Sequence, residues 1–323
     1  MAAKASRQIG RRLAPAPPRR NLLVRLLVGL LIFVLVVPPL WVAVYRFAPP
    51  PITPLMIIRL AGGRGLDYRW RPLREISPAL VQAAVAGEDA RYCQHQGFDF
   101  AAMRAAMRAN ERRPGKVRGG STISQQTAKN AFLWPGRTIV RKGVEAWFTV
   151  LIEKLWGKRR IMEVYLNIVE MGPGIYGAEA AAQHYFHVDA SQLSALQASR
   201  LAAIFPNPLK WQAADPGRYV QRRSRRIGGA MNVIRADGLI ACVGKLSGAP
   251  AGPLIVNAAP PPSARAFVQQ QAKEEEPVTP ATEPQATAPA SDLGPAAQDA
   301  PPAAASDAPA AAPGPAAQEP PAD

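Results

Sequence analysis

Cysteine and histidine are scarce in this chain, and their scarcity excludes several kinds of protein. The 323 residues include two cysteines, Cys93 and Cys242, and three histidines. A disulfide-dense scaffold needs more cysteines, and no Cys/His set has the spacing of a zinc site. An exported chain could join the two cysteines, but their spacing does not show that they meet. We expect two free, buried thiols.

Acidic residues are also few, except near the C-terminal end. The chain has 39 Lys and Arg against 23 Asp and Glu, a net charge of +16, and nine of the acids lie in 274–323. Residues 1–250 therefore carry 37 basic and 14 acidic residues. So positive a field attracts nucleic acid, anionic lipid headgroups or pyrophosphate. We expect no nucleic-acid partner, because zinc-finger spacing, an aromatic RNA-binding pattern and a basic zipper are all missing.

One long apolar run makes the membrane the better partner. Residues 26–45 contain no charge, and about 20 apolar residues suffice for a helix to span a bilayer. Six arginines precede the run within residues 7–25, which predicts a cytoplasmic N-terminus and an exported remainder. The run is longer than the core of a cleavable signal, and no convincing cleavage site follows it. We predict an uncleaved transmembrane anchor over 22–46; a long cleaved signal is the alternative.

Composition divides the rest of the chain into four segments. Residues 1–21 are a basic cytoplasmic tail, and residues 47–72 read as a connector with some extended structure. Residues 73–246 have helical periodicity and few strand signals, which predicts a mainly α domain. Residues 247–323 are rich in Ala and Pro, and Phe267 is their only aromatic residue. This tail cannot bury enough apolar surface to fold, so we expect it to be disordered.

Two local patterns indicate where helices begin. Ser77-Pro78 combines an N-cap residue with proline at the first helical position. Thr122 and Gln125 have the spacing of a capping box, so another helix should begin there.

The second of these helix starts is a candidate binding site. It offers unpaired N–H groups and the positive end of a helix dipole, which suit an anion. Side chains three and four residues apart share one helix face, so this segment presents a polar, basic surface. The residues predicted to bind substrate are Ser121, Thr122, Gln125, Gln126, Lys129 and Asn130. A capped, solvated surface helix is the alternative interpretation.

Two carboxylates are candidates for catalysis. Glu88 continues the apolar stripe of Ala84 and Val85 at a helix end, where burial and the helix dipole disfavour its charged form. A pKa raised in this way suits a general base; an exposed, frayed helix end is the alternative. Glu145 lies one turn after Arg141 at the edge of another apolar stripe, and an ordinary i,i+4 ion pair is its alternative.

Four sequence blocks in this order resemble the peptidoglycan glycosyltransferase family. They are Gly87–Asp99, Arg118–Asn130, Arg141–Phe148 and Ile161–Asn167, and the likeness extends from about Arg74 to about Tyr219. The family comprises monofunctional biosynthetic transglycosylases and the glycosyltransferase domain of bifunctional penicillin-binding proteins. The resemblance implies a lysozyme-like α fold with a small region against the bilayer. It also implies a bacterial inner-membrane protein whose catalytic domain is periplasmic.

The resemblance further implies a reaction and a role for each residue. The family transfers a growing glycan, held on polyprenyl pyrophosphate, to the 4-hydroxyl of lipid II with inversion, forming β-1,4 links. Glu88 matches the family's catalytic base. Glu145 matches a second glutamate that assists leaving-group departure, orients the phosphate-binding residues or holds Mg²⁺ or Mn²⁺. Lys129 and Arg137 match basic residues that contact the pyrophosphate. The implied partners are lipid II, the lipid-linked glycan, the membrane and other cell-wall synthesis proteins.

Missing motifs narrow the activity further. The chain has no Ser-x-x-Lys and no Lys-Thr-Gly, the signatures of a penicillin-sensitive transpeptidase, so we expect no cross-linking activity. A lytic transglycosylase or hydrolase is the first alternative, because two carboxylates could also cleave a glycan. The basic cluster and the uncleaved anchor favour synthesis. A non-catalytic, membrane-anchored scaffold is the second alternative.

Overall fold

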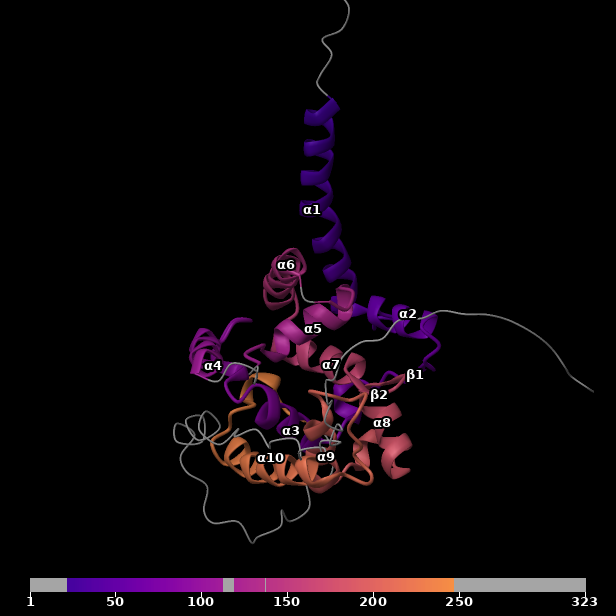
Figure 1. Cartoon of the computed structure of the whole chain (residues 1–323), viewed down its shortest axis with the longest axis vertical. Helices are drawn as coiled ribbons and strands as arrows, with labels where there is room; N and C mark the ends of the chain where they lie inside the picture. Colours follow the sequence, from indigo (N-terminus) through magenta and orange to yellow (C-terminus); the bar gives the residue numbers. More distant parts are fainter. Residues whose placement is uncertain (1–21, 113–118, 137, 247–323) are drawn as a thin grey trace, which may run out of the picture. The chain divides into compact units, whose positions relative to one another are not determined.

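The computed structural model describes residues 22–112, 119–136 and 138–246, and these residues are mostly helical (Figure 1). Their α-helices are α1 (Leu22–Phe47), α2 (Pro54–Ala61), α3 (Pro78–Glu88), α4 (Phe100–Arg112), α5 (Ile123–Phe132), α6 (Ile139–Leu155), α7 (Lys158–Ile168), α8 (Gly177–Phe186), α9 (Ala195–Ile204) and α10 (Arg218–Ala236). Short 3-10 helices are η1 (Leu73–Glu75), η2 (Tyr92–Gln94), η3 (Ala190–Gln192) and η4 (Ala241–Val243). The predicted mainly α class is confirmed. The two expected tails, 1–21 and 247–323, lie outside the described residues.

The strands in the described part of the chain are short and form one small sheet. Strand β1 (Asp67–Tyr68) pairs in parallel with β3 (Ile175–Tyr176), and β3 pairs antiparallel with β2 (Glu170–Gly172). Gly174 lies in the turn between β2 and β3 with a φ of +73°, and a Cβ there would lie 2.2 Å from the carbonyl oxygen of Gly65. Only glycine fits this position without a shift of the backbone.

Helix α3 is buried along most of its length. Ser77 accepts a hydrogen bond from the Ala79 N–H at 3.3 Å, which confirms the predicted N-cap. Every residue of 79–86 is buried, because α3 packs against both α9 and α10. Helix α5 packs against α6 and α7. Since α3 ends at Glu88, the packing of α3 fixes the position of one predicted catalytic carboxylate.

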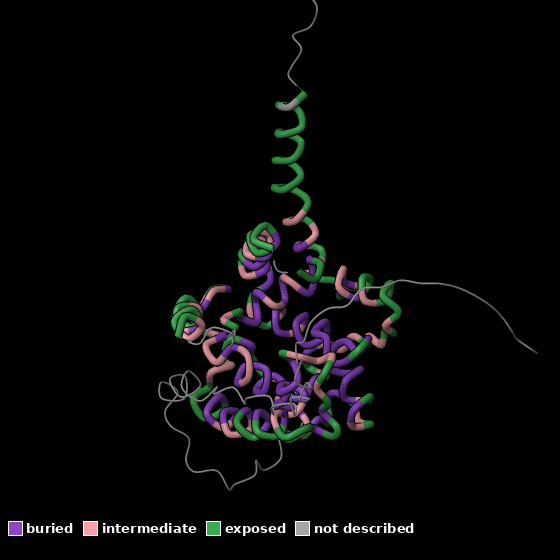
Figure 2. Tube along the Cα trace, viewed as in Figure 1, coloured by how far each residue is buried: buried purple, intermediate pink, exposed green. Residues whose placement is uncertain are grey.

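The C-terminal end of α1 contacts the domain, whereas most of the helix is exposed (Figure 2). The Trp156 indole N–H donates to the Val42 carbonyl at 2.7 Å, and the Arg160 guanidinium donates to the Tyr45 carbonyl at 2.9 Å. The segment Val24–Phe47 is long and apolar enough to cross a membrane. An apolar helix exposed along most of its length is what a membrane anchor requires.

The segment predicted as a connector is more ordered than expected. Residues 47–72 contain α2 as well as β1. Thr53 caps α2 by accepting a hydrogen bond from the Met56 N–H at 3.3 Å, and Pro54 occupies the first helical position. This Thr-Pro pair is the same helix-start signal as Ser77-Pro78, so α2 could have been predicted from the sequence.

The prediction of two free thiols is wrong. Cys93 and Cys242 form a disulfide, with Cα atoms 5.5 Å apart although 149 residues separate them in sequence. Cys93 belongs to η2 and Cys242 to η4, and packing of these two elements against each other brings the thiols together. Sequence spacing carries no information about such a contact.

Candidate active site

The site is organised around the first turn of α5. Thr122 Oγ1 accepts a hydrogen bond from the Gln125 N–H at 3.1 Å, and Gln125 Oε1 accepts one from the Thr122 N–H at 3.1 Å. The predicted capping box is therefore confirmed. Thr122 also donates to the Gly97 carbonyl at 2.6 Å, so its hydroxyl is fully used in holding the helix start.

A cavity of about 460 Å³ lies between α5 and the start of α6. It is lined by Ser121, Gln125, Gln126, Lys129, Gly136, Thr138, Ile139, Arg141, Lys142 and Glu145. Three of these residues are cationic and one is a carboxylate. The cavity is therefore a polar, net positive site of the size of a small-molecule ligand.

The Glu88 carboxylate is held beside this cavity by two partners. Gln126 Nε2 donates to Glu88 Oε2 at 2.9 Å, and Arg223 Nη2 donates to Glu88 Oε1 at 3.0 Å. The side chain of Glu88 is 13% exposed. Tyr165 donates to Gln126 Oε1 at 3.3 Å and so orients the amide. Glu88 is thus neither frayed nor in open solvent.

Glu145 belongs to α6 and lines the cavity, and its side chain is 3% exposed. Arg141 Nη1 donates to Glu145 Oε2 at 3.2 Å, and Lys142 Nζ pairs with Glu145 Oε1. The i,i+4 ion pair is therefore present, but inside a cavity and not on an open helix face. Arg141 is 6% exposed, and its Nε has no hydrogen-bond partner within the described part of the chain. A buried guanidinium with a spare donor suits an anionic ligand.

Lys129 interacts electrostatically with both carboxylates. Burial lowers the pKa of its ammonium from the ordinary 10.5, the charges of Glu145 and Glu88 oppose that shift, and Arg141 and Lys142 add to it. Both carboxylates therefore act electrostatically on one ammonium group. The charge of Lys129 therefore couples the Glu88 carboxylate electrostatically to the Glu145 carboxylate.

Asp89 holds the loop after α3 against the start of α5. Its Oδ2 accepts a hydrogen bond from the Ile123 N–H at 3.0 Å, and its Oδ1 lies 2.9 Å from His95 Nε2. Ile123 N–H is one of the unpaired donors at a helix start, so Asp89 satisfies one donor that an anion could otherwise have used. These contacts make Asp89 a structural hydrogen-bonding residue that holds the end of α3, with Glu88, against the start of α5.

The sequence-predicted residues do not all reach the cavity. Ser121, Gln125, Gln126, Lys129 and Glu145 line it. Thr122 and Asn130 are buried and are not among the lining residues, and the hydrogen bonds of Thr122 favour a structural role. Arg137 lies outside the described residues, and its contact with pyrophosphate stays a prediction.

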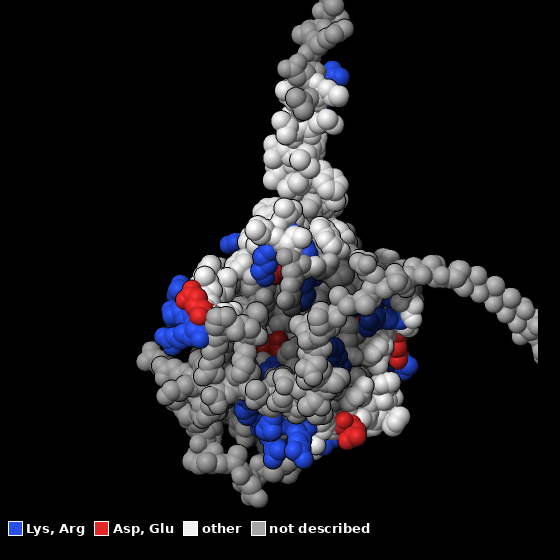
Figure 3. Space-filling view, viewed as in Figure 1, with Lys and Arg blue, Asp and Glu red and all other residues white. Residues whose placement is uncertain are grey.

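Sequence reasoning missed Arg223. It lies on α10, 135 residues after Glu88, and it is 8% exposed among many exposed arginines of the same helix. Its neighbours Arg222 and Arg225 are exposed, and Lys and Arg side chains gather on the surface over α10 in Figure 3. The only available signal was its place on the buried face, shared with Val220, Ile227 and Ala230. That periodicity predicts that Arg223 is buried, but it does not predict that Arg223 contacts Glu88.

The basic run at the start of α7 is structural. Lys158 pairs with Glu153, Arg159 donates to the Val243 carbonyl of η4, and Arg160 donates to the end of α1. None of the three lines the cavity. Glu163 and Asn167 are structural, because they accept hydrogen bonds from the backbone of Leu73 and Arg71.

The residues around Glu145 offer little to a divalent cation by themselves. Within the described ranges no group of three or more His, Cys, Asp or Glu side chains could hold a metal ion. Both oxygens of Glu145 already contact cationic side chains. Mg²⁺ commonly binds through one or two carboxylates together with substrate phosphates, so any metal here would depend on ligands from the substrate.

Comparison with known proteins identifies the family of this chain. Residues 57–232 match a family model described as Transglycosylase. The chain is 59% identical over 224 residues to a biosynthetic peptidoglycan transglycosylase from Caulobacter vibrioides, which covers 69% of this chain and 97% of that protein. A protein of the same description from Rhodospirillum centenum is 55% identical over 200 residues, covering 62% of this chain and 86% of its own. One from Pseudomonas aeruginosa is 52% identical over 189 residues, covering 57% and 81%.

Proposed function

Since this chain belongs to the transglycosylase family and is a peptidoglycan glycosyltransferase, we propose a specific mechanism for its polymerisation of glycan chains. The donor is the growing glycan on polyprenyl pyrophosphate, and the acceptor is the 4-hydroxyl of lipid II. The observation that carries the proposal is a fixed, nearly buried carboxylate that is hydrogen-bonded to Gln126, a residue that lines the net positive cavity.

Glu88 is the general base. It accepts the proton of the 4-hydroxyl as that oxygen attacks the anomeric carbon, and the bond from that carbon to the pyrophosphate oxygen breaks. Gln126 and Arg223 hold the carboxylate in place through hydrogen bonds of 2.9 and 3.0 Å. Inverting displacement requires a base on one face of the sugar and stabilisation of the leaving group on the other. The raised pKa that the sequence predicted for Glu88 stays a prediction.

The cationic cavity receives the pyrophosphate. Charge builds up on the leaving group as the glycosidic bond breaks, and fixed positive groups in a partly dry site stabilise that charge strongly. Lys129 and Arg141 lie in the cavity wall, and the unpaired Arg141 Nε is a donor that a phosphate oxygen would satisfy. Glu145 holds Arg141 and Lys142 in position. Arg137 is proposed to join them.

The enzyme works at a membrane surface. Helix α1 is a candidate span, and exposed apolar residues of α2 and of the start of α6 flank the end of α1 that contacts the domain. Ile139 and Val140 are 92% and 76% exposed. Such a surface suits the bilayer in which both lipid-linked substrates are held. We propose a cytoplasmic N-terminus and a periplasmic catalytic domain in the inner membrane. Contacts with other cell-wall synthesis proteins stay a prediction.

A divalent cation is a separate part of the proposal. Mg²⁺ or Mn²⁺ would bind Glu145 together with phosphate oxygens, and the chemistry it would supply is added stabilisation of the leaving pyrophosphate. No step described above requires it. Polymerisation rates in EDTA and in added Mg²⁺ test the idea, and equal rates would remove the metal from the scheme.

Labelled lipid II tests the central role of Glu88. The wild-type chain in detergent should produce glycan polymer, and Glu88→Gln should lower the rate roughly 100- to 10,000-fold because it removes a general base. Glu75→Gln is the matched control, since Glu75 is 43% exposed and outside the cavity. Release of fragments from isolated cell walls would instead support a lytic enzyme. Full activity of Glu88→Gln would reject Glu88 as the base.

A further inference from the structure

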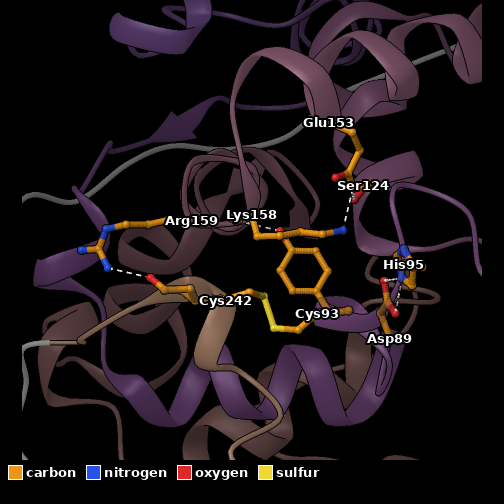
Figure 4. The surroundings of a disulfide bond; sticks show 10 residues. Asp89, Cys93, His95, Ser124, Glu153, Lys158, Arg159 and Cys242 are labelled. Carbon is orange, nitrogen blue, oxygen red and sulfur yellow. Dashed lines mark hydrogen bonds and ion pairs between the residues drawn. A yellow bond between two sulfur atoms is a disulfide. The ribbon is translucent and has the colours of Figure 1, made fainter.

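One end of the disulfide lies in the segment that directly follows α3 and the proposed base Glu88. Cys93 is five residues after Glu88 and four after Asp89 (Figure 4). Its partner Cys242 belongs to η4, six residues after the end of α10. The bridge therefore joins the last described part of the chain to the loop that follows the proposed base.

The loop that carries Cys93 holds the start of α5 at several points. Asp89 accepts the Ile123 N–H at 3.0 Å and contacts His95, and the Gly97 carbonyl accepts the Thr122 hydroxyl at 2.6 Å. These contacts lie on both sides of Cys93 in sequence. A displacement of the loop would therefore move Glu88 and the first turn of α5 relative to each other.

The other end of the bridge is anchored independently. Val243 is fully buried, and Arg159 Nη1 donates to the Val243 carbonyl at 2.9 Å and to the Lys245 carbonyl at 3.0 Å. Arg159 belongs to α7, and η4 packs on α7. Tyr92, beside Cys93, donates to the Lys158 carbonyl at 2.7 Å. The disulfide thus connects the loop to an element that α7 holds in place.

We propose that the Cys93–Cys242 disulfide is a positioning device for the active site, so that polymerase activity depends on the oxidation state of these two cysteines. The inference rests on the proposed role of Glu88. The bridge forms by thiol–disulfide exchange: the two thiols become one disulfide, and a dithiol–disulfide oxidant of the exported compartment is reduced to its dithiol. Cys242 is exposed and Cys93 half-buried, so an oxidant or reductant can reach the bridge.

This arrangement would make the enzyme fully active only after export. In a reducing cytosol the cysteines stay as thiols, and in an oxidising compartment the bridge closes. A role in stability alone is the competing account, because any disulfide constrains the unfolded chain. The two accounts differ in what happens to the folded, reduced protein at a temperature well below its unfolding transition.

The test compares oxidised and reduced full-length chain in detergent at such a temperature. After reduction by a phosphine, kcat/KM with lipid II should fall roughly 10- to 100-fold, because a shift of about 1 Å in a catalytic group can cost that much. Reoxidation with oxidised glutathione should restore the rate. Amide exchange of the peptide over residues 119–126, which contains the Ile123 N–H, should become faster in the reduced form.

Two variants separate positioning from stability. Cys93→Ser/Cys242→Ser should behave like the reduced chain and should not respond to the phosphine. Leu193→Ala keeps the bridge but removes a buried side chain near Ser77, at the opposite end of α3 from Glu88. It should lower Tm while leaving kcat/KM within about twofold of wild type after correction for the folded fraction.

Each outcome decides one question. Unchanged kcat/KM and unchanged exchange in the folded, reduced chain would overturn the proposal, and so would an equal loss in Leu193→Ala at the same loss of Tm. If the double variant does not fold, the reduced wild-type chain provides the result. Failure of the oxidised wild-type chain to polymerise lipid II would reject the proposed function instead.

Discussion

At the residue scale, the ammonium of Lys129 predicts how activity depends on pH. Burial lowers its pKa from 10.5, and Arg141 and Lys142 lower it further. As pH rises through this lowered pKa, the group loses its proton and with it the attraction to pyrophosphate. We expect kcat/KM to fall on the alkaline side at a lower pH than an ordinary lysine would dictate. Lys129→Arg, which stays charged, should move that fall to higher pH. A pH–rate profile that is identical for both proteins would contradict the prediction.

The same lowered pKa makes the free energy of unfolding rise with pH, whereas it makes kcat/KM fall. Because the folded pKa of Lys129 is lowered, the folded chain binds fewer protons at this site than the unfolded chain between the folded pKa and 10.5. The contribution of this site to the free energy of unfolding therefore rises with pH across that window. Lys129→Met should remove this rise and should also abolish polymerisation. Chemical denaturation at a series of pH values measures it.

At the element scale, two helices begin with the same motif in different surroundings. Thr122 and Gln125 cap α5 beside the cavity, and Ser194 and Gln197 cap α9 at an exposed position. Replacing either cap by alanine should cost about 1 kcal/mol of stability. Only Thr122→Ala should also lower polymerisation, because α5 carries Gln126 and Lys129. Denaturation midpoints and lipid II assays of both variants provide the comparison, and equal activities would show that the α5 start does not position the site.

At the scale of the whole molecule, the disulfide closes a loop that includes most of the domain. The 149-residue separation corresponds to about 5 kcal/mol in the chain-entropy account, and removal of a native disulfide typically costs about 2–5 kcal/mol. For a domain of this size, 1 kcal/mol lowers Tm by roughly 2–4 °C. The Cys93→Ser/Cys242→Ser chain should therefore unfold roughly 5–20 °C earlier in calorimetry. A Tm within 2 °C of wild type would show that the disulfide does not stabilise the domain as a whole.

Local chemistry allowed much of this protein to be predicted from its sequence. Hydrophobic periodicity predicted the helices, and cap residues such as Ser77 and Thr122 marked two of their starts. The uncharged run predicted the helix that could span a membrane. Glu88 and Lys129 could be named because block order and spacing resembled one family, and family membership is confirmed. These features depend on residues close in sequence or on order along the chain.

Only the tertiary structure decided which distant residues meet. Arg223 reaches Glu88 across 135 residues, and Cys242 reaches Cys93 across 149, because α10 and η4 fold back on α3 and η2. The tertiary structure also buries Thr122 and brings Lys129 under the electrostatic influence of both carboxylates. The physical reason is that periodicity reports which face of an element is apolar, whereas a contact between elements depends on how several faces pack together at once.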